Sequence, residues 1–236
     1  EFTPFGYSFD IGGGTMNAIH RYRRNPDPYA CGGNQPSNNG NGSLMRIMPA
    51  CIFCVWKQRA EGMTDEKAIE IIHRVGSLTH AHLRANVACG LYYFIVRELI
   101  EGKEPMKGCI RKGLDKGFAF YGNGSESKEE RAYYDRLRDI DAFASLDASA
   151  IKGSGYVVEA LEAALWSLLQ EASFEGALLT AVNLGDDTDT VAAIAGGLAG
   201  LYFGVEEIPD EWIQVIQRRE WIEELCDLAD AELGVL

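Results

Sequence analysis

The residues best suited to chemistry lie in the acidic segment 185–190, which reads Gly-Asp-Asp-Thr-Asp-Thr and runs into an apolar stretch. A turn here can aim the carboxylates of Asp187 and Asp189 and the hydroxyl of Thr190 at one point. These are hard oxygen donors, which suit Mg²⁺ or Ca²⁺ better than Zn²⁺. An EF-hand is excluded, because the positions that require glycine and glutamate hold Ala192 and Leu198. Taken alone, the segment favours an acidic cap on a helix N-terminus, which the helix dipole stabilises.

A second candidate is the segment 9–15, Phe-Asp-Ile-Gly-Gly-Gly-Thr. A glycine-rich turn that opens a helix presents free backbone N–H groups to a phosphate. The segment matches no dinucleotide fingerprint, because the last required glycine is replaced by Asn17, and no lysine follows as in a P-loop. An ordinary turn is the alternative interpretation.

Two further candidates are the segment 39–46, Asn-Gly-Asn-Gly-Ser-Leu-Met-Arg, and the dipeptide Thr79-His80. Glycine and asparagine permit unusual backbone angles, which leave amides free to face a ligand. The alternatives are a mobile loop in which Ser43 caps a helix, and a histidine with a structural role. No Gly-x-Ser-x-Gly elbow is present, so covalent nucleophilic catalysis is not indicated.

Helices must position these segments. Thr64 is a good N-cap before an apolar face over 68–75, and helical spacing continues over 87–94, 158–168 and 190–203. Long alternating strand patterns and repeats are missing from the sequence, so we predict an all-α fold without a domain boundary. We also predict a long loop over 25–43 that is either functional or disordered, a polar mobile stretch over 123–131, and a central helix whose face Gly196, Gly200 and Gly204 lies against a neighbour.

Composition narrows the function further. The 236 residues are 47% hydrophobic and 24% charged, as in globular proteins, and the net charge of -13 argues against a nucleic-acid partner. The sequence shows no signal peptide and no apolar run of membrane length, so we expect a cytoplasmic protein without a membrane partner. Of its six cysteines, only Cys51 and Cys54 are close together, in an apolar run that favours packing over redox or zinc chemistry.

Together these pieces resemble the ADP-ribosylglycohydrolase family, which includes the dinitrogenase-reductase-activating glycohydrolase. The resemblance runs from about Phe5 to Gly204. Its parts occur in the family's order: Phe9-Asp10-Ile11-Gly12, Asn41-Gly42-Ser43-Leu44-Met45-Arg46, Thr79-His80, Gly155-Tyr156-Val157-Val158-Glu159-Ala160-Leu161-Glu162-Ala163-Ala164-Leu165-Trp166 and Asp187-Thr188-Asp189-Thr190.

The resemblance implies that residues 1–236 form a single all-α domain, an orthogonal multi-helix bundle, with a two-magnesium site at the mouth of a cleft. It implies a Mg²⁺-dependent hydrolase that releases ADP-ribose from a modified protein, with arginine favoured, or from a small molecule. By carry-over, the metal ligands are Asp187, Asp189 and Thr190. The expected contacts to ADP-ribose are Gly12, Gly13, Gly14, Thr15, Asn41, Gly42, Ser43 and His80.

The sequence departs from the family pattern in two ways. Members carry an N-terminal Thr-Asp-Asp metal motif and an acidic residue near the chemistry, and we expect both to lie before Glu1 in a longer protein. The catalytic residue is therefore left unassigned, and we expect an N-terminally truncated chain with an open, inactive half-site that holds one Mg²⁺ or none. In addition, Asp186 stands where many members have a second glycine. The alternative function is a non-catalytic, crystallin-like or ADP-ribose-binding member of the same fold.

Overall fold

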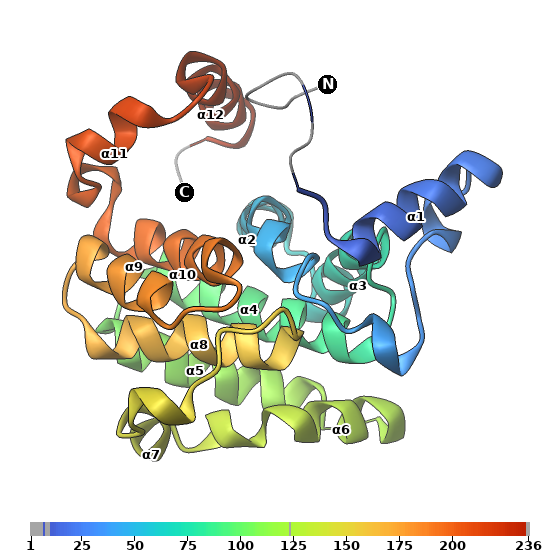
Figure 1. The fold of residues 1–236 in the computed structure, drawn as a ribbon, viewed down its shortest axis with the longest axis horizontal. Helices are drawn as coiled ribbons and strands as arrows, with labels where there is room; N and C mark the ends of the chain where they lie inside the picture. Colours follow the sequence, from blue (N-terminus) through green and yellow to red (C-terminus); the bar gives the residue numbers. More distant parts are fainter. Residues whose placement is uncertain (1–6, 8–9, 123, 235–236) are drawn as a thin grey trace.

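The computed structural model describes residue 7, residues 10–122 and residues 124–234. Phe9, part of the glycine-rich motif, lies outside the described residues. Twelve α-helices and no β-strand occur in the described part, which confirms the all-α prediction (Figure 1). In chain order they are α1 (Gly13–Arg24), α2 (Met48–Glu61), α3 (Asp65–Ser77), α4 (Leu83–Glu101), α5 (Met106–Phe120), α6 (Ser125–Arg131), α7 (Ile140–Ala144), α8 (Val157–Gln170), α9 (Phe174–Asn183), α10 (Thr188–Phe203), α11 (Asp210–Val215) and α12 (Arg219–Leu233).

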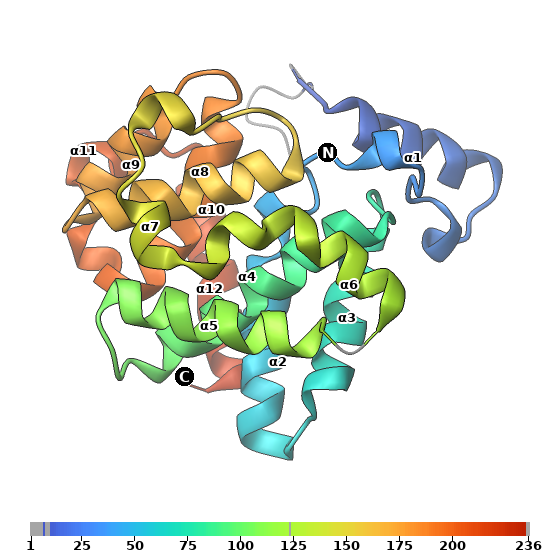
Figure 2. The ribbon, with the colours of Figure 1, turned by 90° about the horizontal axis from the view of Figure 1, so that it is seen from below.

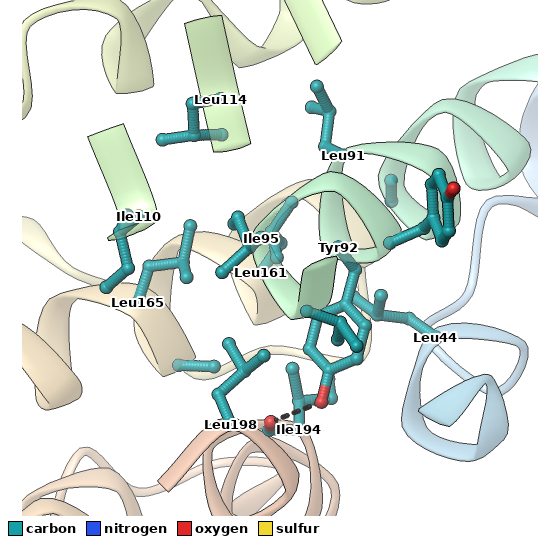
Figure 3. Close-up of a cluster of buried hydrophobic side chains, with 14 of the residues drawn as sticks. Leu44, Leu91, Tyr92, Ile95, Ile110, Leu114, Leu161, Leu165, Ile194 and Leu198 are labelled. Carbon is teal, nitrogen blue, oxygen red and sulfur yellow. Dashed lines mark hydrogen bonds between the residues drawn. The ribbon is translucent and has the colours of Figure 1, made fainter. Parts of the chain in front are cut away.

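Helix α4 is the centre of the bundle. It packs against α2, α3, α5, α8 and α10, and Figure 2 shows it enclosed between them. Its residues are apolar around most of the helix circumference and nearly all are buried, which is the pattern of a core helix. Figure 3 shows the core beside it, where Tyr92 reaches across to α10 and its hydroxyl donates to the carbonyl oxygen of Ile194 at 2.9 Å. The α10 backbone is thereby fixed to the central helix.

Local sequence signals explain several helix ends. The Thr64 hydroxyl accepts from the backbone N–H of Lys67 and caps α3, as predicted. Gly62, in the left-handed region, ends α2. The polar segment that was predicted to be mobile, 123–131, forms helix α6 over 125–131. An ion pair of 2.7 Å between Glu130 on α6 and Arg84 on α4 attaches this polar helix to the core.

The glycine face predicted on α10 is only partly correct. A Cβ added at Gly196 would touch the side chain of Leu178, but one added at Gly200 would have no atom within 4 Å. The close approach occurs instead at Gly197, where an added Cβ would lie 2.7 Å from both Met48 Cε and Tyr92 Oη. Helix α10 packs against α8, α9 and α4, so the prediction of a central helix holds. The face in closest contact, however, contains Gly197 rather than Gly200.

The cysteines are free, and Cys51 and Cys54 are buried on α2 within the hydrophobic core. The Cys54 thiol donates to the carbonyl oxygen of Ala68 at 3.8 Å. The packing interpretation of this pair is therefore confirmed. In the described part of the chain, no helix combines the length and the apolar character needed to cross a bilayer.

Candidate active site

Four segments that the sequence singled out meet at one cleft of about 580 Å³. The residues that line it come from the start of α1, the loop before α2, the turn before α4, the loop before α8 and the start of α10. They are Asp10, Ile11, Gly12, Gly13, Gly14, Thr15, Gly40, Asn41, Gly42, Met45, His80, Gly155, Asp187, Asp189, Thr190 and Ala193. Of the eleven residues predicted for the site, only Ser43 does not line the cleft.

The acidic segment reaches the cleft through a sharp turn before α10. Gly185 and Asp186 both have positive φ angles, +81° and +62°. Left-handed backbone is natural for glycine and tolerated by aspartate, which agrees with the second glycine that the family resemblance implies at position 186. The side chain of Asp186 does not line the cleft.

The three expected metal ligands follow this turn. The backbone N–H of Asp187 donates to the carbonyl oxygen of Gly153 at 2.8 Å. Its carboxylate Oδ2 accepts from the amide Nδ2 of Asn41 at 2.8 Å and makes no cap bond to α10, although Asp187 occupies the N-cap position. The acidic-cap interpretation therefore fails for Asp187. Asp189 Oδ1 accepts from the backbone N–H of Thr190 at 2.8 Å, so Asp189 does stabilise the first turn of α10.

The loop before α2 is held at both sides. Short backbone bridges join it to the turn at His80, where the Ala81 N–H donates to the carbonyl of Gly33 at 2.8 Å, and to the loop before α8, where the Asn41 N–H donates to the carbonyl of Gly155 at 3.0 Å. Arg46 donates from inside the fold to the carbonyl oxygen of Gly42. These bonds favour an ordered loop over the mobile-loop alternative.

Two expectations for Ser43, a helix cap and a contact to ADP-ribose, were wrong. Its side chain makes no cap hydrogen bond. It is fully buried and lies near Gly76 on α3, away from the cleft, and its hydroxyl has no hydrogen-bond partner within the described residues. The side chain of Ser43 is therefore a core residue rather than a contact for a ligand in the cleft.

The imidazole of His80 is surrounded by glycines from the start of α1 and from the loop before α2. A Cβ added at Gly14 would lie 2.7 Å from His80 Nε2, one at Gly42 would lie 2.8 Å from Cε1, and one at Gly40 would lie 3.1 Å from Nε2. His80 Nδ1 shares a hydrogen bond of 2.7 Å with the Thr79 hydroxyl.

Burial, aided by the nearby Arg46 cation, lowers the pKa of His80 to about 4. At neutral pH the ring is uncharged, so His80 offers a ligand hydrogen bonding rather than a positive charge.

Only part of a metal site can be assembled from these residues. Across residues 7, 10–122 and 124–234, no group of three or more His, Cys, Asp or Glu side chains is placed to hold a metal ion. The three expected ligands that line the cleft, Asp187, Asp189 and Thr190, offer two carboxylates and one hydroxyl. Their chemistry fits a hard cation, but Mg²⁺ prefers about six oxygen ligands, so water or other groups would have to complete the shell.

The acidic residue that the family resemblance implies stays a prediction. It was expected before Glu1, which is the first residue of the sequence. No residue of the chain was therefore assigned to catalysis from the sequence. The structure adds one carboxylate to consider inside the chain, that of Asp10, which lines the cleft together with Asp187 and Asp189.

Sequence reasoning missed several residues of the cleft. Asp10 stood inside a quoted motif without a role of its own, and Met45 and Gly155, also in quoted motifs, line the cleft as well. Their position inside those motifs was the only sign in the sequence that they could line the cleft. A thioether and a glycine, however, do not indicate chemistry by residue type.

Comparisons with known proteins agree with this architecture. A family model described as ADP-ribosylglycohydrolase matches residues 2–234. ADP-ribosylarginine hydrolase Tri1 of Serratia proteamaculans is 30% identical over 229 residues, which cover 96% of this chain and 56% of that protein. ADP-ribosyl-[dinitrogen reductase] glycohydrolase of Rhodospirillum rubrum is 25% identical over 213 residues, which cover 89% of this chain and 61% of that protein.

A solved structure described as an ADP-ribosylglycohydrolase-related protein complex superposes with a TM-score of 0.68 at 29% identity, over 91% of this chain and 66% of that one. The chain thus spans a little over half the length of the curated relatives it matches. Since the family model extends over almost all of its residues, the chain belongs to the ADP-ribosylglycohydrolase family.

Proposed function

We propose that this protein hydrolyses the glycosidic bond between ADP-ribose and a modified protein side chain, with ADP-ribosylated arginine as the favoured substrate. The observation that carries the proposal is the single cleft in which a glycine-rich helix start, a neutral histidine and the Asp187–Thr190 segment all take part. Relatives that are named for ADP-ribosylarginine and ADP-ribosylated dinitrogen reductase support the substrate class.

The start of α1 suits the diphosphate of ADP-ribose. Gly12 and Gly13 are exposed, and a Cβ added at either would meet no atom within 4 Å, so a ligand can approach the backbone itself. The first amides of a helix have no intrahelical partner and carry the positive end of the helix dipole. His80 lies beside Gly14 and adds a polar, uncharged contact.

We further propose that the part of the cleft lined by the start of α10 is the reactive end and depends on Mg²⁺, two ions being expected from the family. Asp187, Asp189 and Thr190 would supply protein oxygens to the cation. When bound, Mg²⁺ would orient the ribose hydroxyls and the attacking water and stabilise charge at the anomeric carbon. Asp10, the remaining carboxylate of the cleft, is our candidate within this chain for proton transfer with that water.

We place the reaction in the cytoplasm, where thiols stay reduced. All six cysteines of the chain are free, which supports this assignment.

The decisive test is Asp189→Asn. The substitution keeps an Oδ1 that can accept from the Thr190 N–H, so α10 should keep its first turn while the cation loses a charged ligand. In the full-length protein, we expect Mg²⁺-dependent release of ADP-ribose from ADP-ribosylated arginine to be abolished and the melting temperature to stay unchanged. The matched control is Asp186→Asn, which removes the same charge from the same turn but outside the cleft.

Wild-type turnover by Asp189→Asn would leave Asp189 as a helix cap only and would contradict the metal assignment. Binding of ADP-ribose by the full-length wild-type protein without any turnover would favour the non-catalytic alternative. The presence of carboxylates and a hydroxyl together on one cleft wall favours the enzyme.

A further inference from the structure

The loop before α2 contacts the start of α10 at two places. The amide Nδ2 of Asn41 donates to Oδ2 of Asp187 at 2.8 Å, and the Thr190 hydroxyl donates to the thioether sulfur of Met45 at 3.8 Å. The two contacts join residues that are 146 and 145 positions apart in the chain. One short segment, 41–45, therefore holds two of the three oxygen-bearing residues assigned to the cation.

Asn41 is well placed to fix a side chain rather than to follow a ligand. It is 7% exposed, its backbone N–H donates to the Gly155 carbonyl at 3.0 Å, and its carbonyl accepts from the Met45 N–H at 3.1 Å. Its side-chain amide therefore projects from a backbone that is anchored on both sides. Within the described residues, Asn41 Nδ2 is the one side-chain donor to the Asp187 carboxylate, and Asp187 Oδ1 keeps no protein partner.

We propose that segment 41–45 positions the cation ligands, with Asn41 setting the orientation of Asp187 and Met45 that of the Thr190 hydroxyl. This inference rests on the proposed function, and it changes the role expected for Asn41 from a substrate contact to a positioning residue. A neutral N–H donor occupies one carboxylate oxygen without neutralising the charge, so the other oxygen stays available. Because the Thr190 hydroxyl donates its hydrogen bond to the Met45 sulfur, the lone pairs of the Thr190 oxygen stay available to a cation.

Hydrogen bonds of this kind matter measurably. Removing an outer partner of a metal ligand usually costs about 10–100-fold in metal affinity or activity. The Asn41 bond is short and partly buried, so we expect an effect in this range. The Met45 contact is longer and uses a weak acceptor, so we expect a smaller effect from its loss.

The test is calorimetric titration with Mg²⁺ alone, followed by titration with ADP-ribose in the absence of divalent cations. Asn41→Ala should weaken Mg²⁺ binding by about 10-fold or more and leave cation-free ADP-ribose affinity within about twofold. The matched control is Asn39→Ala, from the same loop, because Asn39 is also buried but its amide donates to the Pro36 carbonyl and it does not line the cleft. This control should bind Mg²⁺ like the wild type.

A second comparison tests whether Asn41 affects Mg²⁺ binding through Asp187. If Asn41 acts through Asp187, Asn41→Ala should weaken Mg²⁺ binding no further once Asp187→Asn is present, because coupled residues are not additive. Met45→Leu, which keeps the size of the side chain, should lower Mg²⁺ affinity by a smaller factor and provides the readout if Asn41→Ala does not fold.

Three results would overturn the inference. Normal Mg²⁺ affinity in Asn41→Ala, together with weaker cation-free binding of ADP-ribose, would make Asn41 a direct ligand contact and leave the proposed function in place. If Asn41→Ala does not fold, normal Mg²⁺ affinity in Met45→Leu would show that segment 41–45 does not position the cation ligands. A full-length wild-type protein that binds no Mg²⁺, or binds it equally well after Asp187→Asn, would remove the cation site itself and the positioning role with it.

Discussion

The glycines of α10 allow a sharp test of the packing. Substituting alanine at either Gly197 or Gly200 should gain about 1 kcal/mol of helix propensity. At Gly200 the new methyl group meets no atom within 4 Å, so this gain should appear as added stability. At Gly197 the methyl group would lie 2.7 Å from Met48 Cε, the flexible end of a side chain, and 2.7 Å from Tyr92 Oη, which is buried and hydrogen-bonded to the Ile194 carbonyl.

The penalty at Gly197 has two parts. Overpacking in a core costs about 1–3 kcal/mol, and loosening the Tyr92 hydrogen bond costs about 1 kcal/mol more. After the propensity gain, Gly197→Ala should be destabilised by roughly 1–3 kcal/mol. For a protein of this size, each kcal/mol shifts the melting temperature by about 2–4 °C. We therefore expect Gly197→Ala to melt lower than wild type and Gly200→Ala to melt higher.

Differential scanning calorimetry of both variants checks the order of melting temperatures. Tyr92→Phe removes the oxygen that the new methyl group meets, so adding it to Gly197→Ala should recover part of the lost stability. If Gly197→Ala proves at least as stable as Gly200→Ala, the close contact between α10 and α4 is not as described, and the reasoning fails.

Two further predictions concern stability. Gly185→Ala should lower the free energy of unfolding by about 1–2 kcal/mol, because alanine is strained at positive φ, whereas Asp186→Gly should be neutral or stabilising; urea denaturation that ranks them the other way would contradict the turn geometry. Burial lowers the pKa values of His73 and His80 to about 4, below the usual 6.5. Between these pH values the histidines are protonated in the unfolded chain but neutral in the native fold. The stability that these residues contribute above pH 6.5 should therefore be lost as the pH falls through 4. His73→Gln should make this decline in urea midpoint shallower, and an unchanged slope would speak against a buried, neutral His73.

Much of the fold and the site was accessible from the sequence, because the signals were local. Helical spacing and the Thr64 cap predicted elements that depend mainly on neighbouring residues, and the ordered motifs identified segments that meet in one cleft. Where the prediction failed, contacts between distant segments decided the outcome. The polar segment 125–131 is helical and held by an ion pair with Arg84, and the depth at which Ser43 lies depends on α3 and α4.

The glycine face of α10 failed for a related reason. Spacing of four residues picked out Gly196, Gly200 and Gly204, but the tight contact is set by where Tyr92 of α4 crosses the helix. Periodicity reveals that a helix has a close neighbour, and only the three-dimensional packing tells which residue meets it. The role of Asn41 was hidden in the same way, because its partner Asp187 is 146 residues distant.

That separation has a consequence for how the protein comes into being. A ribosome adds about 5–20 residues each second, so the 146 residues between Asn41 and Asp187 take roughly 7–30 s to synthesise. During this time the segment 41–45 has no partner from α10, and the Tyr92 hydroxyl lacks its acceptor at Ile194. A nascent chain that already contains the glycine-rich loops and His80 still has an unfinished cleft. Capture of ADP-ribose by stalled nascent chains of increasing length should therefore begin only after α10 has left the exit tunnel.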